Sequence, residues 1–349
     1  MSKRFSEADA RSMWRALALA RKGLGTVSPN PAVGAVLVRK GRVLGEGFHR
    51  RAGLPHAEVE AIEDAYRKGN LPRGATLYVT LEPCCTAGRT PPCVDRIVQE
   101  GIARVVAGMV DPNPRHQGRG LDLLAARGIE VERGLFEEEA RDLNRPFIRW
   151  ITSGRPWVML KSAVSLDGRI GTRPGDSRWL SGSASRRMAH RLRFEADAIL
   201  IGAETARTDD PELTVRLPGT EDKPQPWRVV TTRTGRLPEK LRLLTDPFRE
   251  RTLVFQNYPL SLLLEELGRR GVLRVLAEGG GKLAGSLLAE GLVDEVALFL
   301  CPMILGEGAL SVEPPGPFPG AHFRLREWRR LGDDLFVRGI RGDNVERAE

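Results

Sequence analysis

The sequence has few cysteines and no long apolar segment, and each shortage narrows what the protein can be. Four cysteines in 349 residues are too few for the disulfide framework of a secreted scaffold, so we expect a reducing, cytoplasmic location. No stretch approaches the roughly 18 apolar residues that a membrane span needs, and we expect no membrane partner. The N-terminus also lacks the uninterrupted apolar core of a signal peptide.

Acidic residues are outnumbered by basic ones, which gives a net charge of +9 and an isoelectric point of about 9.8. This balance suits nucleic acid or phosphorylated small molecules. The basic residues form no long block and are mixed with acidic ones, as in SEADARSMWRALALARK. Scattered charge is typical of a solvated surface, so we expect a phosphorylated small-molecule substrate and no nucleic acid. A zinc-stabilised nucleic-acid-binding protein stays as an alternative.

The length and the order of the predicted elements indicate two α/β domains, over residues 1–150 and 151–345. Ser6 and Asp9 form a capping box before an N-terminal helix. Strands are expected over 32–38, 42–47, 75–81, 103–110 and 129–134, with helices over 56–68, 92–100, 119–127 and 137–150. TSGRPW, residues 152–157, has the composition of a linker. The second half begins at 158–168 and has strands near 198–202, 228–230, 274–280 and 295–301, with helices near 183–195, 260–270 and 282–290.

The first half contains the donor set of a catalytic zinc site. His56 and Glu58 form H-A-E, and Cys84 and Cys93 follow the strand expected over 75–81. One histidine and two thiolates leave the fourth position of zinc open for water, which the metal acidifies. A carboxylate must then carry protons, and Glu58 is the candidate. His56 and Glu58 converge only at a helix start, which Pro55 favours.

Two plainer interpretations of these residues stay open. Cys84 and Cys93 could be buried thiols without a metal. A structural zinc with four protein ligands would need Cys85 or Cys301 as its fourth ligand. Cys85 directly follows Cys84, and both could close one tetrahedron only with a strained backbone.

Four segments of the first half resemble the RibD family, the bifunctional deaminase–reductases of riboflavin biosynthesis. They are SPNPAVGAV (28–36), HRRAGLPHAE (49–58), EPCCTAGRTPPC (82–93) and DPNP (111–114). The resemblance implies a cytidine-deaminase-like α/β/α sandwich with a mixed sheet. It implies that His56, Cys84 and Cys93 bind one zinc ion and that Glu58 is catalytic. It places the deaminase substrate near Asn30, His49, Arg89, Asp111 and Asn113.

The second half lacks the dinucleotide fingerprint G-x-G-x-x-G but has EGGGKLAGSLLAEG (278–291), whose glycines would let backbone N–H groups approach a pyrophosphate. With LKSAVSLDGRI (160–170), GDSRWLSG (175–182) and TARTDDPELTVR (205–216), it is similar to the reductase of the same family. The resemblance implies a dihydrofolate-reductase-like α/β domain that uses NADPH. It places the cofactor near Ala163, Trp179, Thr205, Asp209, Gly280, Gly281, Lys282, Leu283, Ala284, Gly285 and Ser286. It places the sugar phosphate near Ser177, Arg193, Leu213, Arg216 and Glu278. Lys161 could bind the substrate and donate a proton as hydride reaches the sugar, or it could equally be a surface lysine.

The resemblance implies two consecutive reactions and a homo-oligomer, a dimer or tetramer. Deamination of a diaminopyrimidine phosphoribosylamine precedes reduction of its ribosyl group to a ribityl group. A single-function deaminase of a nucleobase or of tRNA, with an inactive reductase-like domain, is the alternative. Two positions depart from the family pattern. Thr86 stands where the family has a histidine, and Thr232 stands where it often has an aspartate.

Overall fold

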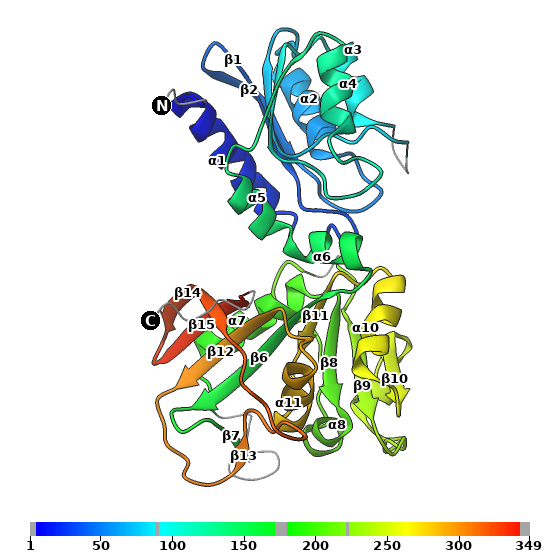
Figure 1. The fold of residues 1–349 in the computed structure, drawn as a ribbon, viewed down its shortest axis with the longest axis vertical. Helices are drawn as coiled ribbons and strands as arrows, with labels where there is room; N and C mark the ends of the chain where they lie inside the picture. The colour runs from blue at the N-terminus through cyan, green and yellow to red at the C-terminus, as the bar shows by residue number, and fades with distance from the viewer. Residues whose placement is uncertain (1–4, 88–90, 172–179, 221–222, 343–349) are drawn as a thin grey trace. The chain divides into compact units, whose positions relative to one another are not determined.

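A computed structural model describes residues 5–87, 91–171, 180–220 and 223–342 of the chain. The chain divides into two compact units, Met1–Ser153 and Gly154–Glu349 (Figure 1). Each unit has its own sheet and its own buried cluster of apolar side chains. We therefore describe the two units separately, as the N-terminal and C-terminal domains.

The N-terminal domain is a mixed sheet with helices on both faces. Its elements are α1 (Glu7–Arg21), β1 (Gly34–Arg39), β2 (Arg42–Phe48), α2 (Ala57–Arg67), β3 (Thr76–Leu81), α3 (Cys93–Gln99), β4 (Arg104–Met109), α4 (Arg119–Ala126), β5 (Glu130–Arg133), α5 (Glu137–Leu143) and α6 (Arg145–Ser153). The strand order is β2-β1-β3-β4-β5. β1 runs antiparallel to β2 and β3, whereas β3, β4 and β5 are parallel. Helices α1 and α5 cover one face, and α2, α3 and α4 cover the other (Figure 1).

Two glycines allow the helices to lie directly on the antiparallel strands. A Cβ atom at Gly34 of β1 would come within 2.1 Å of the Ala16 carbonyl oxygen in α1. A Cβ atom at Gly45 of β2 would come within 2.2 Å of the Ala61 carbonyl oxygen in α2. Only glycine permits these approaches, since real Cβ atoms do not come so close to a backbone oxygen. The position of α2 on the sheet therefore depends on a residue without a side chain.

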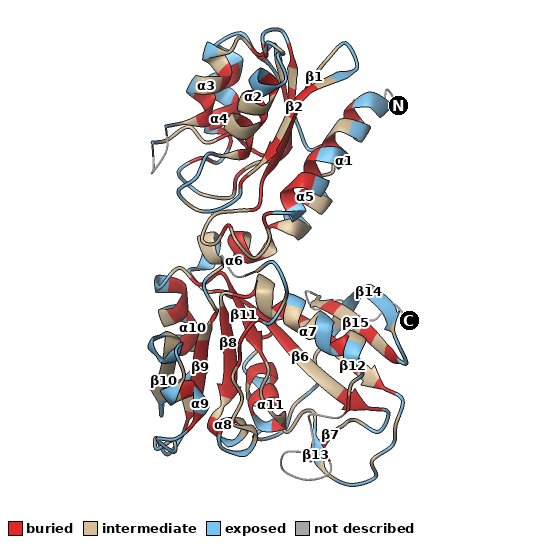
Figure 2. Cartoon of the chain, turned by 180° about the vertical axis from the view of Figure 1, so that it is seen from behind, coloured by how far each residue is buried: buried red, intermediate tan, exposed pale blue. Residues whose placement is uncertain are grey.

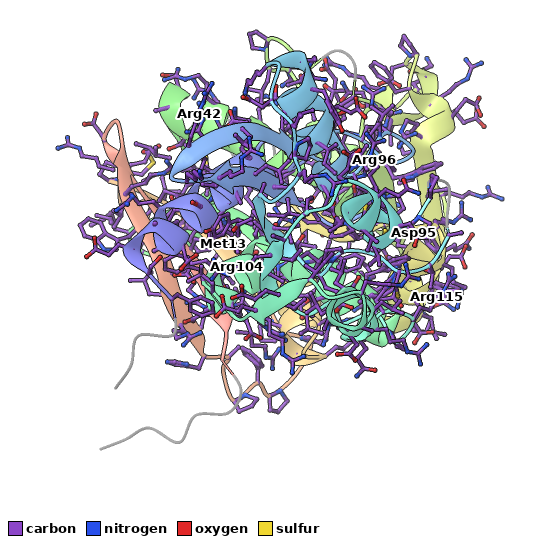
Figure 3. All side chains as sticks on the ribbon, turned by 90° about the horizontal axis from the view of Figure 1, so that it is seen from above. Met13, Arg42, Asp95, Arg96, Arg104 and Arg115 are labelled. Atoms are coloured by element: carbon purple, nitrogen blue, oxygen red, sulfur yellow. The ribbon has the colours of Figure 1, made fainter. Side chains whose placement is uncertain are left out.

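The first helix is tied to the sheet by a buried carboxylate. Ser6 caps α1 and Asp9 completes the capping box, as the sequence predicts. The other Asp9 oxygen accepts hydrogen bonds from the Tyr78 hydroxyl and from Arg104 of β4, each at 2.7 Å. Met13, one turn further along α1 and labelled in Figure 3, is fully buried. Figure 2 shows in red the buried residues along one side of α1.

The single helix expected over 137–150 is wrong, because two helices occupy this stretch. Asn144 separates α5 from α6. Its amide is buried, accepts a hydrogen bond from the Ala32 N–H at 2.8 Å and donates one to the Ala32 carbonyl at 3.0 Å. Pro146 follows, and it has no N–H to continue a helical ladder. A distant contact in the fold thus interrupts a segment whose sequence favours helix.

The C-terminal domain is built on an eight-stranded sheet with the order β10-β9-β8-β11-β6-β12-β15-β14. Its elements are β6 (Trp157–Ser165), β7 (Arg169–Gly171), α7 (Ser183–Glu195), β8 (Ala198–Gly202), α8 (Ala203–Asp209), β9 (Trp227–Thr232), α9 (Arg242–Thr245), the 3-10 helix η2 (Arg249–Arg251), β10 (Thr252–Gln256), α10 (Leu260–Arg269), β11 (Arg274–Ala277), α11 (Gly281–Ala289), β12 (Glu295–Cys301), β13 (Ala309–Leu310), β14 (Phe323–Leu331) and β15 (Asp334–Arg341). The first six strands of the sheet are parallel, and β15 and β14 close it as an antiparallel hairpin.

Apart from the edge strand β10, the parallel strands of this sheet are buried along most of their length (Figure 2). The burial explains their unbroken apolar sequences, such as AILI in β8. The hairpin β14–β15 was not expected from the sequence, because its strands are rich in arginine and only partly buried. Within the described ranges, no helix combines the length and apolarity that crossing a membrane requires.

Candidate functional site

Three separate elements of the N-terminal domain deliver His56, Cys84 and Cys93 to one place. His56 is the N-cap residue of α2, Cys84 lies in the segment after β3, and Cys93 is the first residue of α3. The Nδ1 atom of His56 lies 3.5 Å from Cys84 Sγ and 3.3 Å from Cys93 Sγ. One ligand atom from each residue lies within 4.8 Å of the others. Among the described residues, this is the one group of such side chains arranged to hold a metal ion.

The separations fit a tetrahedral zinc ion. Zinc bonds of about 2.3 Å to sulfur and about 2.0 Å to nitrogen place the two atoms about 3.5 Å apart in a tetrahedron. Two thiolates also neutralise the charge of Zn²⁺, so the ion can be held where Cys93 is buried. Three protein donors leave one tetrahedral position for water or substrate.

The two thiols differ in acidity. The pKa of Cys84 is lowered to about 4, first because the Cys93 thiol donates a hydrogen bond to its sulfur and next because His56 lies beside it. The backbone N–H of Cys93, at the start of α3, also points at Cys84 Sγ at 3.3 Å. Free N–H groups at a helix N-terminus favour a thiolate. Cys84 is thus the first anionic ligand, and the pKa of Cys93 is raised because it donates to that thiolate.

Glu58 lies beside the cysteines in the first turn of α2 and is 4% exposed. Burial raises the pKa of its carboxyl to about 7, and the negative charge of Cys84 adds to the effect. A carboxyl group with such a pKa can both take and give a proton near neutral pH. Helix α2 itself is fixed to α3 through Glu63, which pairs with Arg96 at 2.7 Å (Figure 3 labels Arg96).

Asn30 and His49 are joined in the same domain. His49 is 2% exposed, and its Nδ1 lies 3.0 Å from the Pro55 carbonyl oxygen. This contact makes Nδ1 the protonated nitrogen, so Nε2 accepts from the Asn30 amide at 2.9 Å. Burial lowers the pKa of His49, which keeps the ring neutral. Its ring stands edge-on to that of His56 at 5.2 Å between centroids.

Asp111 and Asn113 hold the loop after β4 in shape. Asp111 Oδ1 accepts from the Asn113 N–H at 2.9 Å, and Asn113 Oδ1 accepts from the Arg115 N–H at 3.0 Å. Burial raises the pKa of Asp111 to about 6, with a contribution from the charge of Cys84. The structure therefore places Asp111 within electrostatic reach of the zinc ligands and gives both side chains a local role as well.

Sequence reasoning overlooked Glu82, which organises this loop. Its buried carboxylate accepts hydrogen bonds from the N–H groups of Asp111 at 3.0 Å, Gly118 at 2.8 Å and Gly120 at 2.8 Å. Its position directly after β3 and two residues before Cys84 was a usable signal, because a charged residue that is buried at the end of a strand needs hydrogen-bond partners.

Several expected residues are placed away from the zinc ligands or are not described. Cys85 contacts His116, with Sγ 3.5 Å from Nδ1. Cys301 is buried in β12 of the C-terminal domain. Neither residue joins the group formed by His56, Cys84 and Cys93. Arg89, Ser177 and Trp179 lie outside the described residues.

In the C-terminal domain, Arg193 and Glu278 form a buried ion pair. Arg193 Nε and Nη2 donate to the two Glu278 oxygens at 2.8 and 2.7 Å. Although burial opposes ionisation, the Arg193 charge and its hydrogen bonds lower the pKa of Glu278 to about 2. Burial lowers the pKa of Lys161 in β6, and the negative charge of Glu278 opposes this shift. The Arg193 fork is occupied by this carboxylate, and Nη1 donates to the Thr214 carbonyl.

The glycine-rich segment is largely helical, as the helix expected near 282–290 predicts. α11 begins at Gly281, so Gly281, Lys282, Leu283, Ala284, Gly285 and Ser286 form its first turns. Cβ atoms at Gly281 and Gly285 would each lie 2.2 Å from a backbone oxygen of Leu310 or Glu313, so close packing against that segment requires these glycines.

Only the start of α11 keeps the character expected of an anion site. It has no side-chain cap, which leaves N–H groups of its first turn for a phosphate. Gly280 donates its N–H to Thr205 Oγ1 at 3.3 Å, which brings two expected cofactor residues together. Asp209 is the last residue of α8, and Ala163 lies on β6.

Leu213 and Arg216 lie in the segment that follows α8. Leu213 is buried with a φ of 51°, and the Arg216 side chain is 56% exposed. The Arg216 N–H donates to His190 Nδ1 at 3.2 Å. His190 was not expected from the sequence. Burial, with the charges of Arg193 and Arg216, lowers its pKa to about 4, and its place three residues before Arg193 on α7 could have indicated a shared face.

Comparison with known proteins decides between the open interpretations. A family model described as the cytidine and deoxycytidylate deaminase zinc-binding region matches residues 6–109, and one for the RibD C-terminal domain matches 156–337. The RibD protein of Aquifex aeolicus is 40% identical over 95% of this chain and 98% of its own. That of Escherichia coli is 39% identical over 94% and 98%. The chain belongs to the RibD family.

Solved RibD structures have the same fold. Form 1 of Acinetobacter baumannii RibD superposes with a TM-score of 0.88 at 37% identity, over 97% of this chain and 99% of that one. A Thermotoga maritima diaminohydroxyphosphoribosylaminopyrimidine deaminase/5-amino-6-(5-phosphoribosylamino)uracil reductase gives 0.87 at 38% identity, over 96% and 99%. The expected fold class is confirmed, with a cytidine-deaminase-like domain before the RibD reductase domain.

Membership of the RibD family also defines the two activities. The N-terminal domain is a zinc-dependent deaminase domain, and the C-terminal domain is an NADPH-dependent reductase domain. The chain is a bifunctional enzyme of riboflavin biosynthesis. A deaminase with an inactive second domain is not favoured, because the RibD relatives match both halves of the chain.

Proposed function

We propose that the chain deaminates 2,5-diamino-6-(5-phosphoribosylamino)pyrimidin-4-one and then reduces the ribosyl group of the product to a ribityl group. The single observation that carries this proposal is the convergence of His56, Cys84 and Cys93 beside the buried carboxyl of Glu58. The substrate follows from the likeness to the Thermotoga maritima enzyme, whose two named activities act on these compounds in turn.

In the deaminase, His56, Cys84 and Cys93 would hold zinc and Glu58 would move the protons. Zinc, when bound, acidifies water so that it attacks at neutral pH. Glu58 takes a proton and later gives one to the departing amine, a role that suits its pKa of about 7. Asn30, whose amide donates to the neutral ring of His49, is held ready to bind the pyrimidine edge.

The remaining deaminase residues would surround the substrate. Asp111 and Asn113 form the loop that Glu82 holds, and we assign them to the rim of the pyrimidine pocket. Arg89 is assigned to the phosphate on the grounds of its guanidinium group and its position between Cys84 and Cys93 in the sequence. Thr86 can donate a hydrogen bond there, but it cannot carry charge.

In the reductase, the polar residues of the C-terminal domain would bind substrate and cofactor. NADPH supplies the hydride. Lys161, which is within electrostatic reach of Glu278 and Arg193, would give a proton to the sugar as it is reduced. Arg216, which is more exposed than Arg193, is the guanidinium available to the sugar phosphate. The start of α11, with Gly280 and Thr205, would hold the cofactor phosphates.

We assign the remaining expected contacts by their place in the sequence motifs. Ala163, Trp179 and Asp209 are proposed for the cofactor, and Ser177 and Leu213 for the sugar phosphate. A cytoplasmic location and a homo-oligomeric state stay predictions.

Replacing Glu58 tests the proposal. We expect Glu58→Gln to lower deaminase turnover by about 100- to 10,000-fold, the contribution of a positioned acid–base group. Zinc content and NADPH oxidation with the deaminated substrate should be retained. The substrate is supplied with and without NADPH, and the products are identified by mass. Glu60→Gln, on the same helix α2, is the matched control. Deamination by Glu58→Gln at the wild-type rate would refute the mechanism.

A further inference from the structure

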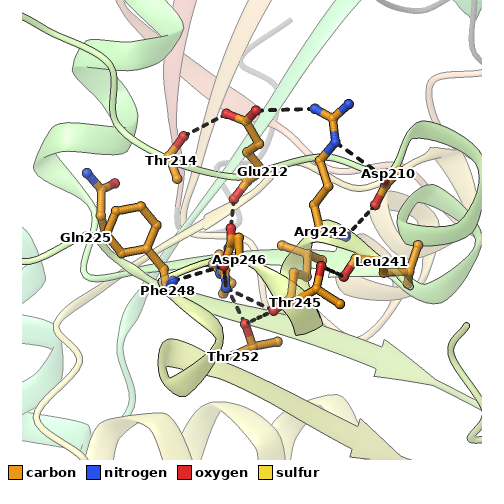
Figure 4. A network of polar contacts seen from close by, with 12 residues as sticks. Asp210, Glu212, Thr214, Gln225, Leu241, Arg242, Thr245, Asp246, Phe248 and Thr252 are labelled. Atoms are coloured by element: carbon orange, nitrogen blue, oxygen red, sulfur yellow. Dashed lines mark hydrogen bonds and ion pairs between the residues drawn. The ribbon is translucent and has the colours of Figure 1, made fainter. Parts of the chain in front are cut away.

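In the segment of residues 210–216, the carboxylate of Glu212 is paired with two arginine side chains. Glu212 Oε2 accepts from Arg216 Nη1 at 2.7 Å and from the Thr214 hydroxyl at 3.4 Å. Glu212 Oε1 accepts from Arg242 Nη1 at 3.2 Å. Figure 4 shows this carboxylate between Thr214 and Arg242. Two guanidinium groups and a hydroxyl converge on one anion, a donor set that equally suits phosphate oxygens.

Buried and partly buried side chains hold the main chain around Glu212 in place. Arg228 is fully buried, pairs with both oxygens of Asp246 and donates from Nη1 to the Glu212 carbonyl at 3.3 Å. Arg193 donates to the Thr214 carbonyl at 3.2 Å, and His190 accepts from the Arg216 N–H. The backbone of the segment is therefore held in place, so only its side chains can exchange hydrogen-bond partners.

The side chains, in contrast, lie at the surface. Those of Arg216, Glu212 and Arg242 are 56%, 41% and 59% exposed. Exposed ion pairs contribute little free energy because water and salt screen them. A dianionic phosphate monoester can therefore replace the singly charged carboxylate on Arg216 at small cost.

We propose that the Glu212 carboxylate competes with the phosphate of the reductase substrate for Arg216. When the substrate binds, its phosphate displaces the Glu212 carboxylate from Arg216 toward Arg242. The inference rests on the proposed function, since it takes Arg216 as the phosphate ligand. Arg242 receives the displaced carboxylate because it already binds the other Glu212 oxygen. Asp210 keeps Arg242 in position, with Oδ1 accepting from the Arg242 N–H at 2.8 Å and Oδ2 lying 3.5 Å from Nε (Figure 4).

Glu212→Gln is the direct test. The change leaves Arg216 with a neutral neighbour, so we expect the KM for the deaminated substrate and the inhibition constant of ribose 5-phosphate both to fall about two- to five-fold, the scale of an exposed ion pair. Both constants are measured by NADPH oxidation with the full chain. Glu266→Gln is the matched control, because Glu266 of α10 is a partly exposed carboxylate bound by two arginines, Arg269 and Arg270, and it should change neither constant.

A second variant separates displacement from simple charge repulsion. Glu212→Asp keeps the charge but withdraws the carboxylate by one methylene, so it should lower both constants as Glu212→Gln does. If Glu212→Asp behaves as wild type while Glu212→Gln binds more tightly, repulsion alone is at work and the inference is overturned. An unchanged or higher KM in Glu212→Gln overturns it as well. Failure of the proposed function has a different signature, namely no NADPH oxidation by the wild-type chain.

Discussion

The deaminase and reductase sites handle charge in different ways. In the N-terminal domain, His56, Cys84 and Cys93 contact one another, and the groups that would meet a metal ion point at a shared centre. In the C-terminal domain, both arginine candidates already have a partner of opposite charge, Arg193 in Glu278 and Arg216 in Glu212. One site is organised around an ion, and the other is balanced within the chain.

This difference follows from the ligands that the two domains bind. A metal ion binds tightly to donors that are already close together. The histidine and the two thiols that three elements hold near one another therefore lose little conformational entropy on binding. A phosphorylated sugar and a dinucleotide must arrive and leave. If Arg216 exchanges the Glu212 carboxylate for a phosphate, as proposed above, its charge is paired in both states.

Removing one zinc ligand gives the largest expected effect. We expect Cys84→Ser to lose bound zinc and to lower deaminase turnover by about 1000-fold or more, since zinc needs thiolate donors to be retained and to acidify water. Zinc is measured by atomic emission on the purified chain. Cys85→Ser is the matched control, because Cys85 lies next to Cys84 but contacts His116 instead. Equal zinc loss in both variants would contradict the assigned ligand set.

The second effect concerns the buried pair of the reductase. Glu278→Gln should destabilise the C-terminal domain by about 3–5 kcal/mol, because it leaves the Arg193 charge buried without a partner. Chemical denaturation measures the loss, and zinc content reports that the N-terminal domain is intact. The double variant Arg193→Leu/Glu278→Leu should recover much of the stability. If the single variant is as stable as wild type, the two sites do not differ in the way described.

The smallest effect is a pH dependence at His190. Its folded-state pKa is about 4, below the ordinary 6.5, because burial and the charges of Arg193, Arg216 and Lys161 oppose protonation more than Glu278 favours it. The unfolded chain therefore binds the proton first as pH falls. The stability that His190 contributes is present above about pH 6.5 and is lost toward pH 4, by about 1–3 kcal/mol.

The His190→Gln variant isolates this contribution. The glutamine amide oxygen can still accept from the Arg216 N–H, but it does not titrate. Denaturation of both proteins between pH 4 and 7 should show a steeper loss for wild type. Parallel curves would show that the pKa of His190 is the same in the folded and unfolded states, and the assigned cause would be wrong.

The sequence predicted that His56, Cys84 and Cys93 converge because each stands in a short motif of the deaminase signature, although they are 28 and 37 residues apart. His56 begins a helix, Cys84 follows a strand and Cys93 begins another helix, so each ligand stands at an element boundary that Pro55, Pro83 and Pro92 mark. Element ends of this kind are visible as breaks in hydrophobic patterning.

The partners of buried charges could not be predicted in the same way. Glu82 is bonded to three N–H groups that lie 29 to 38 residues away, and Glu278 to an arginine 85 residues away. No local pattern encodes such pairs, since they exist only once the sheet is assembled. The break at Asn144 has the same origin, because its partner Ala32 lies 112 residues earlier.

Glu82 also limits how the loop after β4 can move. Because one carboxylate binds the amides of Asp111, Gly118 and Gly120 and stands two residues before Cys84, the loop is not a hinged flap. To open, it must break bonds on the segment that delivers a zinc ligand. Loop and ligand segment thus belong to one cooperative unit of local unfolding, so a change that loosens the loop is expected to loosen the segment that carries Cys84 as well.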